Sequence, residues 1–407
     1  MNKNNVFSYL SHWFNKYEKF KDFESKYNPW NYEEASSLVK RYNKLVTIEN
    51  YNIESTNSEY FKLVSYLKEC DTIENKFSWV KSTLGNSTCN SLKLLDRNKV
   101  DNISIHYEKP SHIFGNIENG IIFHCLINPN IYTYVSKEKY NSNNTYDFKA
   151  YLKQKINLYS KKFDEIYSPI DIRDICDFDE SIVEKEFNEI KQELKDKISN
   201  TELNEIINTK YYLSKYFAKL FTDNDKQKLS RYIIGDIYYR GGKYDKNTIT
   251  KNIENINKNI KNKIVNLESY PFKSSKPNER ISSLENPFIE FSAYIIIWRI
   301  CKSIKNEDDL KPVFIFRGYK KHWHKKILNV INKILNESKN NKNVKAEEIE
   351  QFFIENYFYT NSSTQNASLS YTNIIKINPK TLTNDKKENQ VNIDYELYYK
   401  IKDKLIN

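Results

Sequence analysis

The stretch Gly120-Ile-Ile-Phe-His-Cys-Leu-Ile-Asn-Pro-Asn130 decides how the rest of this sequence is interpreted. Its run Ile121–Ile127 is short, apolar and bounded by turn-forming residues, which predicts a buried strand. Pro129 cannot extend a ladder of strand hydrogen bonds, so we expect the strand to end there. The Asn128 amide is then held at the carboxyl end of the strand, where it can orient a water or bind a base edge. A plain strand-to-loop turn is the alternative, because Asn-Pro is a common turn starter.

Other segments place this strand within a larger sheet. Further strands are predicted at Tyr232–Tyr239, Pro312–Phe316 and Asn356–Thr360. Helices are predicted at Ile182–Ile198, Thr248–Leu267, Pro287–Ile304 and from Arg317-Gly318 through Leu335. Strands that alternate with helices in this way predict an α/β fold with a mainly parallel sheet and right-handed crossovers.

The N-terminal region differs from this alternating part of the chain. Val6–Phe23 carries apolar residues at three- and four-residue spacing, which predicts an amphipathic helix serving as a cover or as a surface for a protein partner. The predicted organisation is a helical N-terminal region at 1–101, an α/β core at 102–385 with helical insertions near 180–225 and 245–305, and a C-terminal helix at 386–407.

The composition favours a polyanionic partner. The chain of 407 residues has 64 Lys and Arg against 53 Asp and Glu, a formal net charge of +11. That excess favours DNA or a nucleotide as the partner. A Lys-rich codon usage would give the same sign, so the charge supports this class of partner without identifying it.

Cysteine usage and hydropathy indicate the compartment. The five cysteines are scattered and form no C-x-x-C pair, which favours a reducing cytoplasm over a disulfide framework or a zinc knuckle. The N-terminus lacks the apolar segment of a signal peptide. The longest apolar stretch, Ala293–Trp298, is too short to cross a bilayer. We therefore expect a cytoplasmic protein with no membrane partner.

Loops after the predicted strands carry the candidate binding residues, because sites in open parallel sheets gather where strands end. These loops are Asn128–Tyr134, Arg240–Tyr244, Arg317–Trp323 and Asn361–Ser370. Basic residues interleaved with aromatic ones suit contacts with phosphates and bases. The candidate nucleic-acid-binding residues are Tyr132, Tyr134, Arg240, Lys243, Arg317, Lys320, Lys321, Trp323 and Ser363.

Acidic and histidine residues offer two further hypotheses. Asp236, inside a predicted strand, is a candidate general base, with a hydrogen-bonded structural role as the alternative. The acids of Asp171–Glu180 suggest a metal-dependent nuclease, although their spacing fits no ligand pattern. His322 and His324 point apart on a helix, and no nearby Asp, Glu or Cys completes a metal site. We therefore expect no metal and no cofactor.

Two segments resemble motifs of the uracil-DNA glycosylase superfamily. Ile127-Asn128-Pro129 is similar to the first motif of the mismatch-specific branch, Gly-Ile-Asn-Pro-Gly, with Leu126 and Asn130 in place of the two glycines. Asn361-Ser362-Ser363, after a late strand, resembles the second motif, with Ser362 where the family has Pro. The resemblance covers these two motifs and the order of the strands between them.

The resemblance implies a three-layer α/β/α sandwich with a pocket for a flipped base. By carry-over, Asn128 would position the hydrolytic water and Asn361 would steady the departing base. The implied activity is metal-independent hydrolysis of an N-glycosidic bond in DNA or in a nucleotide. An amide cannot act as a general base, so a non-catalytic nucleic-acid binder, for example in phage defence, stays open beside the nuclease hypothesis.

Overall fold

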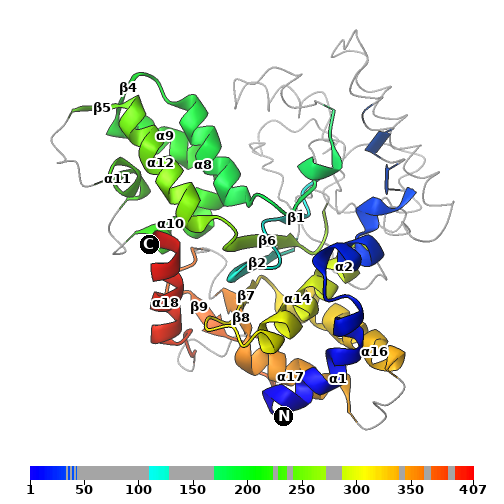
Figure 1. The fold of residues 1–407 in the computed structure, drawn as a ribbon. Helices are drawn as coiled ribbons and strands as arrows, with labels where there is room; N and C mark the ends of the chain where they lie inside the picture. The colour runs from blue at the N-terminus through cyan, green and yellow to red at the C-terminus, as the bar shows by residue number, and fades with distance from the viewer. Residues whose placement is uncertain are drawn as a thin grey trace, which may run out of the picture.

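The structure is a computed structural model, shown in Figure 1. It describes residues 1–33, 35–36, 39–40, 43, 110–127, 169–222, 228–235, 242–271, 287–338, 344–361, 368–383 and 390–407.

A seven-stranded sheet runs through the molecule in the order β3-β1-β6-β2-β7-β8-β9. Its strands are β1 (Ile113–Phe114), β2 (Ile122–Leu126), β3 (Cys176–Asp177), β6 (Ile264–Glu268), β7 (Val313–Phe316), β8 (Phe358–Asn361) and β9 (Ile374–Lys376). The central strands β6, β2, β7 and β8 are parallel to one another. β1 is antiparallel to β6 and parallel to β3, and β9 is antiparallel to β8.

The order of the four parallel strands creates a topological switch point. From β2 the chain moves to β6 on one side, and it then returns past β2 to β7 and on to β8 on the other side. The connection that leaves β2 therefore runs toward β6, whereas the connection that leaves β7 runs in the opposite direction, toward β8. In open α/β sheets the carboxyl ends of strands at such a point form the usual ligand site.

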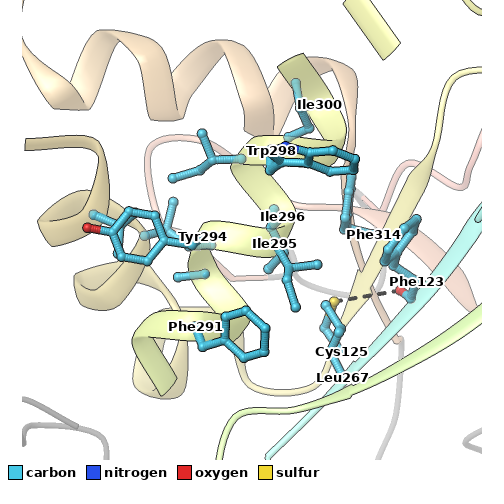
Figure 2. Packing of buried hydrophobic residues seen from close by; sticks show 14 of the residues in the cluster. Phe123, Cys125, Leu267, Phe291, Tyr294, Ile295, Ile296, Trp298, Ile300 and Phe314 are labelled. Carbon is cyan, nitrogen blue, oxygen red and sulfur yellow. Dashed lines mark hydrogen bonds between the residues drawn. The ribbon is translucent and has the colours of Figure 1, made fainter. Parts of the chain in front are cut away.

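An aromatic-rich cluster covers the first face of the sheet. It is formed by α1 (Lys3–Lys16), α2 (Phe20–Tyr27), the 3-10 turn η1 (Pro29–Asn31), α14 (Pro287–Lys305), α16 (His324–Glu337) and α17 (Ala346–Asn356). Figure 2 shows α14 side chains packed near Phe123 of β2 and Phe314 of β7. The Trp298 ring is fully buried, and its Nε1 donates a hydrogen bond to the carbonyl oxygen of Tyr17 at 2.7 Å. This bond ties α14 to the turn between α1 and α2.

A second, largely aliphatic cluster covers the opposite face. Its helices are α8 (Ile182–Glu193), α9 (Asn200–Thr209), the π-helix η4 (Leu213–Phe217), α10 (Ala218–Phe221), α11 (Leu229–Ile234), α12 (Lys246–Ile260) and α18 (Tyr395–Ile406). A two-stranded ribbon of β4 (Lys197–Ser199) and β5 (Lys243–Asp245) lies beside these helices, apart from the main sheet (Figure 1). The remaining short elements are η3 (Ile172–Asp174) and α15 (Tyr319–His322).

The strand β2 is buried on both faces, as its apolar sequence requires. Phe123 and Cys125 belong to the first cluster, whereas Ile122 and Leu126 belong to the second. Because side chains alternate along a strand, His124 also faces the second cluster. On its second face, β2 therefore carries a polar residue between the apolar Ile122 and Leu126.

The structure confirms the predicted α/β fold with a mainly parallel sheet, whereas the three-layer sandwich and the domain boundaries stay predictions. Four predicted elements differ from the structure. The helix predicted at Val6–Phe23 is two helices, α1 and α2, and the helix predicted at Ile182–Ile198 ends at Glu193, with Ile198 in the strand β4. Tyr232–Ile234 belong to the helix α11, which ends at Gly235 with a φ of 78°. The helix predicted at Thr248–Leu267 ends at Ile260, and a left-handed Asn262 precedes the central strand β6.

None of the helices in the described ranges has both the length and the apolar character that spanning a bilayer requires.

Candidate functional site

Several strands of the sheet present polar residues at their carboxyl ends. Ile127, directly after β2, leads into Asn128, which itself lies outside the described residues. Arg317 directly follows β7, and Asn361 is the last residue of β8. Since β2, β7 and β8 are parallel neighbours, the structure brings Arg317, Asn361 and the approach to Asn128 to one edge of the sheet.

The other predicted site residues fall into three groups. Asn128, Tyr132, Tyr134, Asp236, Arg240 and Ser363 lie outside the described residues. Lys320 and Lys321 are exposed on α15, just after the Arg317 strand end. Lys243 is exposed on the separate ribbon of β4 and β5, so it is not part of the strand-end edge.

Trp323 requires a correction. The side chain is fully buried, and its ring centroid lies 5.4 Å from that of Phe316. A ring packed in this way has no free face for a nucleic-acid base. The spacing of Trp323 beside basic residues therefore reflects the packing of α15 and α16 against the sheet.

Glu268 of β6, Leu126 of β2 and Arg317 after β7 lie side by side across the sheet. Leu126 is the register partner of Glu268 on β6, and Cys125 is the partner of Phe316, so Arg317 follows at the level of Leu126. Alternation places Glu268 and Arg317 on the second face. Glu268 is almost fully buried, and its Oε1 accepts a hydrogen bond from the Tyr212 hydroxyl at 3.0 Å.

Two unpaired polar side chains lie one row deeper. His124 and Asn266 are register partners on β2 and β6, and both are buried. Within the part of the chain that the structure describes, neither ring nitrogen of His124 and neither amide atom of Asn266 has a hydrogen-bond partner. Burial and, to a smaller extent, the charge of Arg317 lower the pKa of His124 to about 3, so its imidazole is neutral. Unpaired groups of this kind are rare and demand an explanation.

The π-helix η4 brings tyrosines over these residues. The Tyr216 ring lies 4.5 Å from the His124 ring in an edge-on arrangement, and its hydroxyl accepts a hydrogen bond from Arg317 Nη1 at 2.8 Å. Burial raises the pKa of Tyr212 well above its usual value, and the nearby Glu268 carboxylate raises it further. Tyr212 therefore stays a protonated hydrogen-bond donor. Helices of this π type are short and frequent at functional sites.

A buried carboxylate anchors the start of η4. Glu186 of α8 accepts hydrogen bonds from the backbone N–H groups of Tyr212 and Leu213, at 2.9 and 2.5 Å. Burial raises the pKa of Glu186 to about 7, although these two bonds act in the opposite direction. The position of the tyrosines over the sheet therefore depends on a group that titrates near neutral pH.

The acids behind the nuclease hypothesis have local structural partners. Asp171 and Asp174 form a capping box on η3, and Asp177 pairs with Lys185 at 2.7 Å. Within the described residues, no cluster of three or more His, Cys, Asp or Glu side chains is arranged to hold a metal ion. These contacts account for the acids as caps and ion pairs.

The candidate site residues that the sequence did not single out are His124, Asn266, Glu268, Tyr212 and Tyr216. His124 lies inside the decisive stretch, but a His in an apolar run carries no signal by itself. Asn266 and Glu268 alternate with apolar residues, a strand pattern hidden by the charged helix before it.

Comparison with known proteins gives no relative for this arrangement: no family model, no curated protein and no solved structure matches the chain.

Proposed function

We propose that this chain hydrolyses the N-glycosidic bond of a nucleotide, free or within DNA, at the carboxyl ends of β6, β2, β7 and β8. The observation that carries the proposal is Glu268, an almost fully buried carboxyl group on the same face and at the same level as Arg317. The site lies at the switch point of the sheet, where ligands bind in open α/β folds.

Glu268 supplies a group that the two asparagines of the glycosylase-like motifs lack. Cleavage of the bond leaves positive charge on the sugar, and water must add to that sugar. A carboxylate can stabilise the charge or take a proton from the water, whereas an amide can only orient the water. In the proposal, Asn128 positions this water and Glu268 activates it.

The leaving base develops negative charge and needs hydrogen-bond donors. Asn266 and Asn361 offer amide N–H groups, and a neutral His124 offers one ring N–H. The surrounding tyrosines limit access of water, which strengthens each of these interactions. In the proposal, these groups hold the base while Glu268 acts at the sugar.

The test is release of free base. Oligonucleotides containing uracil or hypoxanthine, and the corresponding mononucleotides, are incubated with the protein, and free base is quantified by chromatography. We expect Glu268→Gln to reduce the rate by about 100-fold or more and Asn128→Ala to reduce it as well. The matched control is Glu254→Gln, which alters a mostly exposed carboxylate of α12. Unchanged release by Glu268→Gln, or no release from any substrate, contradicts the proposal.

A binder without catalysis is the second candidate, and the net charge of +11 with the exposed Lys320 and Lys321 beside Arg317 favours it. It would show affinity for single-stranded DNA that falls steeply with salt, with no product formed. Filter binding at several salt concentrations, alongside the base-release assay, distinguishes the two.

A further inference from the structure

Two cations share one tyrosine at the edge of the site. The guanidinium carbon of Arg317 lies 5.7 Å from the Tyr216 ring centroid, and the Lys215 Nζ lies 5.6 Å from the same centroid. Arg317 Nη1 donates a hydrogen bond to the Tyr216 hydroxyl, and Lys215 Nζ donates one to the Tyr211 hydroxyl at 3.0 Å. The two hydroxyls are themselves 3.3 Å apart.

Neither cation is neutralised within the described parts of the chain, where no carboxylate lies within ion-pair distance of Arg317 or Lys215. This differs from two buried cations elsewhere in the chain. Lys210 contacts Glu189 at 3.0 Å and Glu193 at 2.5 Å, and Arg299 contacts Asp308 at 2.8 Å.

The Tyr216 hydroxyl, which accepts the hydrogen bond from Arg317, does not supply negative charge. Burial is the largest cause of a raised pKa for Tyr216, so this group stays protonated even though Arg317 and Lys215 act in the opposite direction. Two positive charges held beside one neutral ring repel each other. The repulsion is relieved when an anion binds between them, and a guanidinium fork is well suited to phosphate oxygens.

The placement of the pair suits a ligand that also reaches Glu268. Arg317 and Glu268 are on β7 and β6, with β2 between them. The usual strand spacing of about 4.8 Å puts the two backbones about 10 Å apart. A ligand of mononucleotide size is long enough to span that separation.

We propose that Arg317 and Lys215, held by the hydroxyls of Tyr216 and Tyr211, bind the phosphate adjacent to the sugar whose base is released. This inference rests on the proposed function for the identity of the ligand. The same phosphate chemistry is offered by a free nucleoside monophosphate and by the backbone of a DNA strand. Lys215 and the two tyrosines belong to this subsite together with Arg317.

The experiment measures binding without turnover. Calorimetric titration compares a nucleoside 5′-monophosphate, the matching nucleoside, inorganic phosphate and a short single-stranded oligonucleotide. We expect a phosphate-bearing ligand to bind about tenfold tighter than the nucleoside, as one charge-assisted contact would give. Arg317→Met and Lys215→Met should each remove most of that preference and leave nucleoside affinity unchanged. If the monophosphate binds more tightly than the nucleoside, the ligand is a free nucleotide. If only the oligonucleotide binds more tightly, the ligand is a DNA strand.

Controls separate a subsite from general charge and from misfolding. Lys251→Met removes an exposed cation of α12 and should leave the phosphate preference intact. Tyr216→Phe keeps the ring and removes only the hydroxyl that holds Arg317, so it should weaken the preference in a folded protein. Equal binding of nucleoside and phosphate-bearing ligands, or an equal loss with Lys251→Met, overturns the inference. A phosphate preference without base release would refute the proposed function alone.

Discussion

The start of the π-helix η4 gives the sharpest stability prediction. Glu186→Gln removes a titratable group whose carboxylate accepts two backbone N–H groups, those of Tyr212 and Leu213. The side chain is only 7% exposed, so solvent screening is slight. Glutamine keeps the size and one acceptor oxygen, and it mimics the protonated form of the carboxyl group.

The sign follows from the direction of the pKa change. The pKa of Glu186 is about 7 in the folded chain against 4.5 for an unperturbed Glu. The folded state therefore binds the proton more tightly than the unfolded chain, and stability falls as the pH rises from about 4.5 to about 7. A pKa difference of one is worth about 1.4 kcal/mol, so this loss amounts to about 3 kcal/mol.

The assay is urea unfolding of wild type and Glu186→Gln at a series of pH values from 4.5 to 8. We expect the variant to gain about 3 kcal/mol relative to wild type across that range. Glu254→Gln, which alters a mostly exposed carboxylate, should show no such gain. A constant difference between wild type and Glu186→Gln at every pH would refute the reasoning.

Three other substitutions test the packing and the site. Trp298→Ala should cost about 3–5 kcal/mol in urea unfolding, because it removes a fully buried ring and its hydrogen bond to Tyr17. Gly115→Ala should cost about 3 kcal/mol by the same measurement, since its φ is 109° and an added Cβ would lie 2.1 Å from the Ile264 carbonyl oxygen. His124→Leu should raise stability by about 1 kcal/mol, because it removes an unpaired buried group, and it should lower base release. A loss of stability with unchanged release would contradict the role given to His124.

The strands β2, β7 and β8 could be predicted because sequence marks both their interiors and their ends. Ile122–Leu126 and Val313–Phe316 are short apolar runs, and each is followed by a residue pattern that ends a strand, Asn128-Pro129 or Arg317-Gly318. Parallel pairing then puts their carboxyl ends at one edge. The convergence of Arg317 and Asn361 was predictable on these grounds alone.

The strand β6 could not be predicted in the same way. Ile264-Val-Asn-Leu-Glu268 follows a charged helix without any Gly or Pro, so its apolar residues continue the helical spacing of α12. The break depends on Asn262 adopting a left-handed conformation, which Asn tolerates but does not require. At Tyr232–Ile234 the sequence predicts a strand where the structure has the helix α11. A short apolar run fits a buried helix as well as a strand, so its sequence does not distinguish the two.

The strand β6 contributes two of the polar residues of the proposed site, Asn266 and Glu268. On the first face, β2 and β6 present Phe123, Cys125, Val265 and Leu267, and no polar side chain interrupts the packing. On the second face the same two strands present His124, Asn266 and Glu268 as neighbours. Among the described residues, His124 and Asn266 have unpaired side chains, and each unpaired buried polar group costs about 1–3 kcal/mol, so aliphatic residues at these two positions would make a more stable sheet. Within β2 and β6 this cost falls on one face, beneath the strand ends where Arg317 and Lys215 lack carboxylate partners among the described residues, and the proposed ligand site accounts for that placement.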